Sequence, residues 1–167
     1  FFLKNRGKNV KDAMIYEDNL FGSQDDVDID HLNAANGHCV RALYFYSGIA
    51  DLAAETGDER LLSNLRSVFK DITERKMYIT GGVGSTYRTE SFTVPYDLPN
   101  QTAYNESCAA IALILFAARM RQMDRNSVYG DTVERVLYNG LLSSTSLDGR
   151  SFFYENPLEI NLSEHNR

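Results

Sequence analysis

The sequence predicts an all-α fold built from helical hairpins, and three observations lead to this class. Apolar residues recur at steps of three or four over three segments, which is the period of an amphipathic helix, and a fourth segment is apolar on almost every side. Short turns join these segments in pairs, as in antiparallel helical hairpins. A long stretch without this period, residues 77–104, lies between the two pairs.

Repeated helical hairpins are typical of a toroid of paired helices, and a closed toroid needs about a dozen helices. The four or five helices expected here therefore predict a partial (α/α)6 toroid. A chain of 167 residues with 43% apolar content is large enough for one domain with a real core. We expect residues 1–167 to form a single partial domain, a slice of a larger catalytic or binding domain.

The first hairpin is expected from residue 39 to about residue 72. Its first helix carries an apolar face made of Cys39, Ala42, Leu43, Tyr46, Ile49, Ala50 and Ala53. Gly57 then predicts the end of this helix and Asp58 the start of the next. The second helix carries Leu61, Leu62, Leu65, Val68, Phe69 and Ile72.

The second hairpin is expected after the central loop. Residues 107–123 are apolar on almost every side, which predicts a helix buried on most of its faces. We expect Asp131 to cap a further helix that carries Val133 and Val136 and ends near Gly140. Residues 151–157 predict a short β segment and a turn near the C-terminus.

The central loop, residues 77–104, is unusually long for a compact helical domain, and such loops are usually functional or disordered. Its five aromatic residues favour an ordered loop: Tyr78, Tyr87, Phe92, Tyr96 and Tyr104. The run Gly81-Gly82-Val83-Gly84 lacks the lysine and the spacing of a phosphate-binding loop. It predicts a backbone that turns sharply or lies close to a ligand.

Charge and composition exclude several classes of function. The 17 basic and 23 acidic residues give a formal net charge of −6, which does not suit a nucleic-acid-binding protein. No apolar run approaches the roughly 20 residues that span a membrane. The two cysteines, Cys39 and Cys108, are expected as free thiols rather than a disulfide framework, which favours the cytoplasm without fixing the compartment.

Glu106 and Cys108 form the first candidate site. Two residues apart on a regular helix, these side chains would point about 200° apart, but at a helix N-terminus they can converge on one ion. Zinc accepts oxygen and sulfur ligands, and a stable site needs about four of them. The alternative is that Glu106 is a capping carboxylate and Cys108 a small core residue.

Glu90 and His38 are the other candidates that the residue pattern offers. Glu90, in the central loop, forms with Glu106 a candidate carboxylate pair for glycoside hydrolysis, although it could equally be a solvated loop charge. His38 precedes an apolar helix and could donate to a polyol substrate or lie near a metal. Its alternative is a half-buried histidine at the start of a helix.

Several spaced motifs resemble one family of enzymes. Those around the central loop are YITGGVGST at 78–86, ESF at 90–92, YDLPN at 96–100 and YNESCA at 104–109. Those outside it are GHCVRA at 37–42, LYNG at 137–140 and FFYENPL at 152–158. Together they resemble the β-L-arabinofuranosidases of glycoside hydrolase family 127, over residues 30 to 160.

The resemblance implies an (α/α)6-barrel catalytic domain, followed in full-length members by β-sandwich domains. It implies a retaining exo-hydrolase that releases L-arabinose from β-L-arabinofuranosides, with an arabinose-containing oligosaccharide as substrate. In this family one Glu and three Cys hold a zinc ion, and one of those cysteines is the nucleophile. Glu106 and Cys108 match two zinc ligands, Glu90 matches the general acid/base, and His38 and Tyr154 match residues that contact the sugar.

The family's other two cysteines are an adjacent pair further along the chain, which we expect beyond residue 167. The 167 residues alone are therefore expected to be inactive. Two other functions stay open at this point: another carbohydrate-active (α/α)6 enzyme, such as a lyase, an unsaturated-sugar hydrolase or an epimerase, or a non-catalytic glycan-binding helical module. A partial toroid exposes apolar faces, so a homo-oligomer is also expected.

Overall fold

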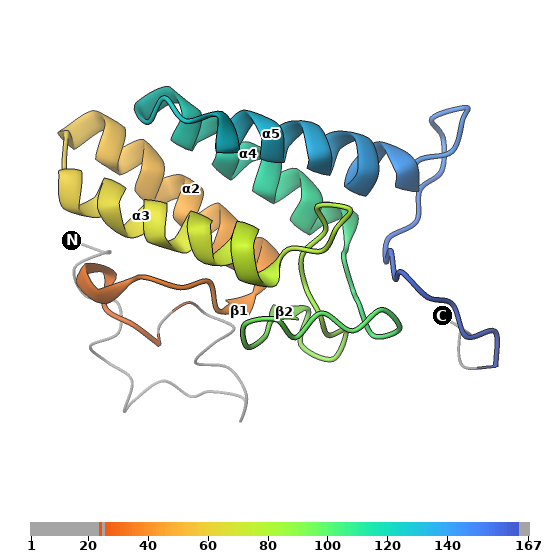
Figure 1. Ribbon diagram of the computed structural model, residues 1–167. Coiled ribbons are helices and arrows are strands. Elements are labelled where there is room, and N and C mark those ends of the chain that lie inside the picture. Colours follow the sequence, from red (N-terminus) through yellow and green to blue (C-terminus); the bar gives the residue numbers. More distant parts are fainter. Residues whose placement is uncertain (1–23, 25, 164–167) are drawn as a thin grey trace.

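The computed structural model describes residue 24 and residues 26–163. Four helices dominate it: α2 (Cys39–Thr56), α3 (Glu59–Asp71), α4 (Ser107–Met123) and α5 (Ser127–Arg135). Figure 1 shows them as two antiparallel hairpins lying side by side, with α2 packed along α4. This arrangement confirms the predicted all-α class of paired helices.

The turn between α2 and α3 forms as the sequence predicts. Gly57 adopts a left-handed backbone with φ of 65°, and its N–H donates to the carbonyl of Ala53. The carboxylate of Asp58 accepts the N–H of Arg60 and so caps the start of α3. A glycine followed by an aspartate therefore reverses the chain within two residues.

The start of α5 differs from the prediction. The helix begins at Ser127, where the side chain of Asn126 accepts the N–H of Val128. Asp131, which was expected to cap this helix, lies inside it, so that prediction is wrong. Both Asn and Asp are good capping residues, and the earlier one in the chain starts the helix. A wider π-helical segment, Val136–Leu141, continues from its end.

The core joins all four helices through one row of aromatic rings. Tyr46 of α2 contacts Phe116 of α4, with ring centroids 5.7 Å apart. Phe116 contacts Phe69 of α3 at 5.6 Å, and Phe69 meets Tyr129 of α5 edge-on at 4.7 Å. All four residues are buried. Aromatic pairs at these distances add to the stabilisation that burial provides.

A small sheet lies beside the N-terminal end of α2 (Figure 1). Strand β1 (Gly37–His38) pairs antiparallel with β2 (Ser91–Phe92), with Gly37 opposite Phe92 and His38 opposite Ser91. The sequence did not predict this sheet. It anchors the middle of the long loop, which is ordered as its aromatic residues indicated.

The β segment expected near the C-terminus is a single antiparallel bridge between Thr145 and Phe152. The chain then runs back to the start of α4, where the Ser107 N–H donates to the carbonyl of Tyr154 at 3.0 Å. Within the described residues, both cysteines are free thiols. No helix in that part of the chain is both long and apolar enough to cross a membrane.

Asp124, just after α4, ties three helices together. It accepts hydrogen bonds from Arg66 of α3 at 2.9 Å and from the Tyr129 hydroxyl of α5 at 2.8 Å. Replacing Asp124 by Ala is expected to lower the free energy of unfolding by about 1 kcal/mol near pH 7, because the site is partly exposed. Urea unfolding of the purified protein measures this loss.

The same carboxylate predicts a pH dependence. The hydrogen bond from Arg66 holds the pKa of Asp124 below its usual value. Its contribution is therefore present above the unfolded-state pKa of about 3.9 and disappears as pH falls through the lowered pKa. Asp148→Ala is the comparison: the hydrogen bonds from Ser146 and Arg150 also lower the pKa of that carboxyl, but they lie within one turn and join no helices, so its loss of stability should be smaller at every pH. A loss from Asp124→Ala that stays constant down to about pH 2 would contradict the assignment.

Candidate active site

The pairing of β1 with β2 brings His38 and Glu90 together although they are 52 residues apart. The Nε2 atom of His38 lies 2.8 Å from Oε2 of Glu90. The backbone carbonyl of Glu90 accepts the N–H of Cys39, the first residue of α2, at 2.9 Å. Glu90 has a φ of 53°, a left-handed conformation that non-glycine residues adopt rarely. The sheet thus fixes both the backbone and the side chain of Glu90.

Tyr104 holds the other oxygen of the Glu90 carboxylate. Its hydroxyl donates to Oε1 at 3.0 Å, and the residue is buried. Burial raises the pKa of Tyr104, and the hydrogen bond to Glu90 adds to the rise, so the phenol remains a donor. Sequence analysis counted Tyr104 only among the loop aromatics. Its place in the motif YNESCA, two residues before Glu106, was the available signal.

Glu106 directly precedes α4, but its side chain makes no capping hydrogen bond. The interpretation of Glu106 as a capping carboxylate is therefore wrong. The residue is 2% exposed, and neither carboxylate oxygen has a hydrogen-bond partner among the described residues. A buried carboxylate in this state is costly unless a cation or a proton compensates it.

The electrostatic surroundings of Glu106 agree with this view. Burial raises the pKa of Glu106, and the nearby charge of Glu90 raises it further. The hydroxyl of Tyr154 lies close enough to oppose this rise, without reaching normal hydrogen-bond geometry. Glu106 is therefore a buried carboxyl group whose nearest donors, Tyr154 and Tyr104, lower its pKa less than burial raises it.

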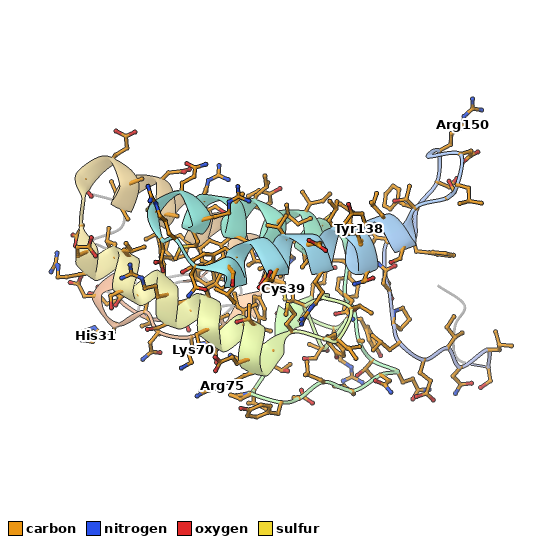
Figure 2. The ribbon with its side chains drawn as sticks, turned by 45° about the horizontal axis from the view of Figure 1, so that its top comes forward. His31, Cys39, Lys70, Arg75, Tyr138 and Arg150 are labelled. Atoms are coloured by element: carbon orange, nitrogen blue, oxygen red, sulfur yellow. The ribbon has the colours of Figure 1, made fainter. Side chains whose placement is uncertain are left out.

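The two cysteines differ in their surroundings. Cys108, in the first turn of α4, is partly exposed, and its Sγ lies 3.9 Å from the Tyr154 hydroxyl. Cys39 is buried in the interior (Figure 2), and burial raises its pKa well above the usual value. Cys39 is thus a neutral core thiol, whereas Cys108 faces the same region as Tyr154.

The five residues predicted from the sequence come together at one place. His38, Glu90 and Glu106 each offer a ligand atom, and these atoms lie within 4.8 Å of one another. Tyr154 adjoins them, since its ring lies edge-on to Tyr104 at 6.1 Å. Cys108 reaches the group through its contact with the Tyr154 hydroxyl and is not one of the three clustered ligands.

The donors suit a metal ion. Glu106 offers a buried carboxylate without a hydrogen-bond partner in the described part of the chain. Cys108, two residues further along in the first turn of α4, offers a thiol. Zinc binds both donor types and in structural sites takes four ligands. The residues present therefore fit part of a zinc site. His38 and Glu90 give a second set of donors around the same carboxylate.

The glycine run packs against side chains of the protein itself. A Cβ atom on Gly82 would come within 2.7 Å of the side-chain Cγ of Asn105, the residue before Glu106. Gly84 has a φ of 101° and lies against the Sγ of Cys39, where a Cβ atom would be 3.3 Å away. The sharp turn that the sequence predicted is present. Its close approach is to Asn105 and Cys39, which flank the site.

Comparison with known proteins identifies close relatives. A family model described as the catalytic domain of GH127 β-L-arabinofuranosidases matches residues 1–167. Among curated proteins, a non-reducing end β-L-arabinofuranosidase of Bifidobacterium longum subsp. longum is 42% identical over 125 residues. That alignment covers 75% of this chain and 19% of the relative.

Two solved structures are similarly close. The GH127 β-L-arabinofuranosidase Ara127N-Se from Geobacillus stearothermophilus T6 superimposes with a TM-score of 0.91 and is 40% identical, covering 99% of this chain and 28% of that one. Another GH127 β-arabinofuranosidase has a TM-score of 0.85 and 42% identity, covering 94% of this chain and 24% of that one. The chain thus spans about a quarter of each solved structure.

The contact between Gly82 and Asn105 predicts the effect of one substitution. Gly82→Ala is expected to lower the free energy of unfolding by about 1–3 kcal/mol, because the new methyl group overlaps the Asn105 side chain. Gly130→Ala is the matched control. Gly130 lies in α5 with open space around it, so alanine should stabilise the helix by up to about 1 kcal/mol. Equal effects of the two substitutions in urea unfolding would refute this account.

Proposed function

Because this chain belongs to the glycoside hydrolase family 127 of β-L-arabinofuranosidases, we propose that it forms part of the catalytic domain of a retaining enzyme. The substrate is an oligosaccharide with a terminal β-L-arabinofuranosyl group, and the product is L-arabinose. The Bifidobacterium relative, a non-reducing end β-L-arabinofuranosidase, supports this choice. No observation on the described residues favours a lyase, an epimerase or a non-catalytic module.

The observation that carries the proposal is the setting of Glu90. Its carboxyl group is fixed by His38 on one oxygen and by Tyr104 on the other, and it faces a second carboxyl group, Glu106. A positioned carboxylic acid can protonate the departing oxygen of a glycoside and then, as carboxylate, activate water. We assign Glu90 this general acid/base role.

Glu106 and Cys108 are proposed to hold a zinc ion. Burial of the Glu106 carboxylate without a hydrogen-bond partner in the described part of the chain supports a cation there. The remaining ligands are two cysteines outside these 167 residues, and one of these is the nucleophile. When bound, zinc keeps a coordinating thiol deprotonated near neutral pH. The 167 residues alone are therefore expected not to turn over substrate.

His38 and Tyr154 are proposed to contact the sugar. The His38 side chain is 19% exposed and adjoins Glu90, so a ring bound there would meet both groups. Tyr154 is about half exposed and its hydroxyl lies beside Cys108. Hydroxyl and imidazole groups both donate and accept, which suits the alternating needs of sugar hydroxyls.

The first test is Glu90→Gln in the full-length enzyme. Loss of proton donation should lower kcat/KM, which reports the step that releases the leaving group, about 10²–10⁴-fold on an arabinoside with a sugar leaving group. The loss should be much smaller on a 4-nitrophenyl arabinoside, whose leaving group departs without protonation. Glu55→Gln, on the exposed side of α2, is the control and should leave both rates unchanged. Equal losses of kcat/KM on the two substrates would contradict the assignment. Retention of configuration is tested separately, by proton NMR of the anomer of arabinose that forms first.

The second test concerns the metal. Glu106→Gln and Cys108→Ser are each expected to lower zinc affinity of the full-length enzyme about 10- to 100-fold or more, measured by chelator competition. Cys39→Ala is the control, because Cys39 is a buried core thiol, and it should keep its zinc. Zinc loss in His38→Gln with full retention in Cys108→Ser would instead place the ion among His38, Glu90 and Glu106.

A further inference from the structure

A buried ion pair lies behind the sheet that carries His38. Nζ of Lys76 is 2.9 Å from Oδ2 of Asp71, and each residue is only 5% exposed. Arg75, the residue before Lys76, points outward (Figure 2), and its guanidinium is 4.0 Å from Oδ1 of Asp71. Asp71 ends α3, and Lys76 ends the π-helical segment Ile72–Lys76 that follows it.

Both members of this pair bind the backbone of the same residue, Ala35. Oδ2 of Asp71 accepts the N–H of Ala35 at 2.9 Å. Nζ of Lys76 donates to the carbonyl of Ala35 at 2.6 Å. Ala35 is fully buried, so no water can replace these bonds. The ion pair therefore hydrogen-bonds both the N–H and the carbonyl of Ala35.

The π-helical segment Ile72–Lys76 brings the two charged side chains close enough to bind Ala35 together. In a regular α-helix, residues five apart point about 140° away from each other. In a π-helix the hydrogen bonds join residues five apart, so the side chains of such residues approach one another along the axis. The π-helical segment thus aligns Lys76 with Asp71, and this gives a physical reason for its place at the end of α3.

Ala35 is three positions before His38 in the chain. Gly37 and His38 form β1, whose pairing with Ser91 and Phe92 carries Glu90. A shift of Ala35 would therefore move β1, and with it the contact between His38 and Glu90. Sequence connectivity and the sheet together link the ion pair to the candidate acid/base.

Stability alone does not call for such a pair. Removing two charges from water is expensive, and well-packed apolar residues of similar volume are often as stable or more so. What the charges add is directional hydrogen bonding to both groups of Ala35, which an apolar pair cannot supply.

We propose that Asp71 and Lys76 are positioning residues that hold β1 in register, so that His38 and Glu90 are aligned for proton transfer to the leaving group. This role rests on the proposed function of Glu90. Asp71 and Lys76 would act through the backbone of Ala35 and not by direct contact with the substrate.

The test uses the full-length enzyme and the double variant Asp71→Leu/Lys76→Met, which keeps apolar volume and removes the grip on Ala35. With an arabinoside that has a sugar leaving group, kcat/KM should fall roughly 10- to 100-fold, as misplaced catalytic groups cost. With the 4-nitrophenyl arabinoside, kcat/KM should change about threefold or less, because departure of that group needs no protonation. Lys76→Gln keeps a donor for the Ala35 carbonyl and should restore part of the activity.

The controls separate positioning from folding. Arg66→Met removes a different ion pair of α3, the one with Asp124, and it should lower kcat/KM for both substrates equally or not at all. Equal slowing of both substrates by the double variant, or no slowing, would overturn the positioning role. If the double variant does not fold, Lys76→Met, which removes the donor to the Ala35 carbonyl, decides by the same ratio, with an unchanged ratio overturning the proposal. If Glu90→Gln also slows both substrates equally, the proposed function itself fails.

Discussion

Two residues of each strand, Gly37–His38 and Ser91–Phe92, make the contact on which the candidate site depends. A ladder this short is not stable in isolation. It persists because its surroundings fix it: Gly37 adopts a φ of 72°, the first N–H of α2 binds the Glu90 carbonyl, and Ala35 is gripped behind it. The helices thus act as the support for a small piece of irregular structure that carries the polar side chains.

A second constraint is electrostatic. Glu106 and Glu90 lie close together, and the charge of Glu106 contributes to the raised pKa of the buried Cys39 thiol. Negative charge in a buried region raises the pKa of every acidic neighbour, whereas a bound cation reverses the sign of this effect. Glu106 lacks a hydrogen bond among the described residues, so a proton or a bound cation must compensate its charge.

The helices could be predicted from the sequence because their signals are local. The apolar period and the Gly57–Asp58 caps lie within one or two turns of the structure they specify. The start of α5 was misplaced because Asn126 and Asp131 are both plausible caps, and only the packed structure selects one. Strands of two residues show no period, and Asp71 and Lys76 have the wrong spacing for an α-helical pair, so the sheet and the ion pair gave no signal.

The site residues were located by spaced motifs, because no single spacing specified their chemistry. Their convergence depends on packing far from the motifs. Both α2 and α4 begin at the site, at Cys39 and Ser107, and they are joined by the contact between Tyr46 and Phe116, two to three turns further on. That contact is part of the packing of α2 against α4, and the N-terminal ends of these two helices carry the Glu90 contact and Glu106. Core packing and site geometry are therefore linked, since a close-packed interior transmits a displacement of the aromatic rings to the ends of both helices.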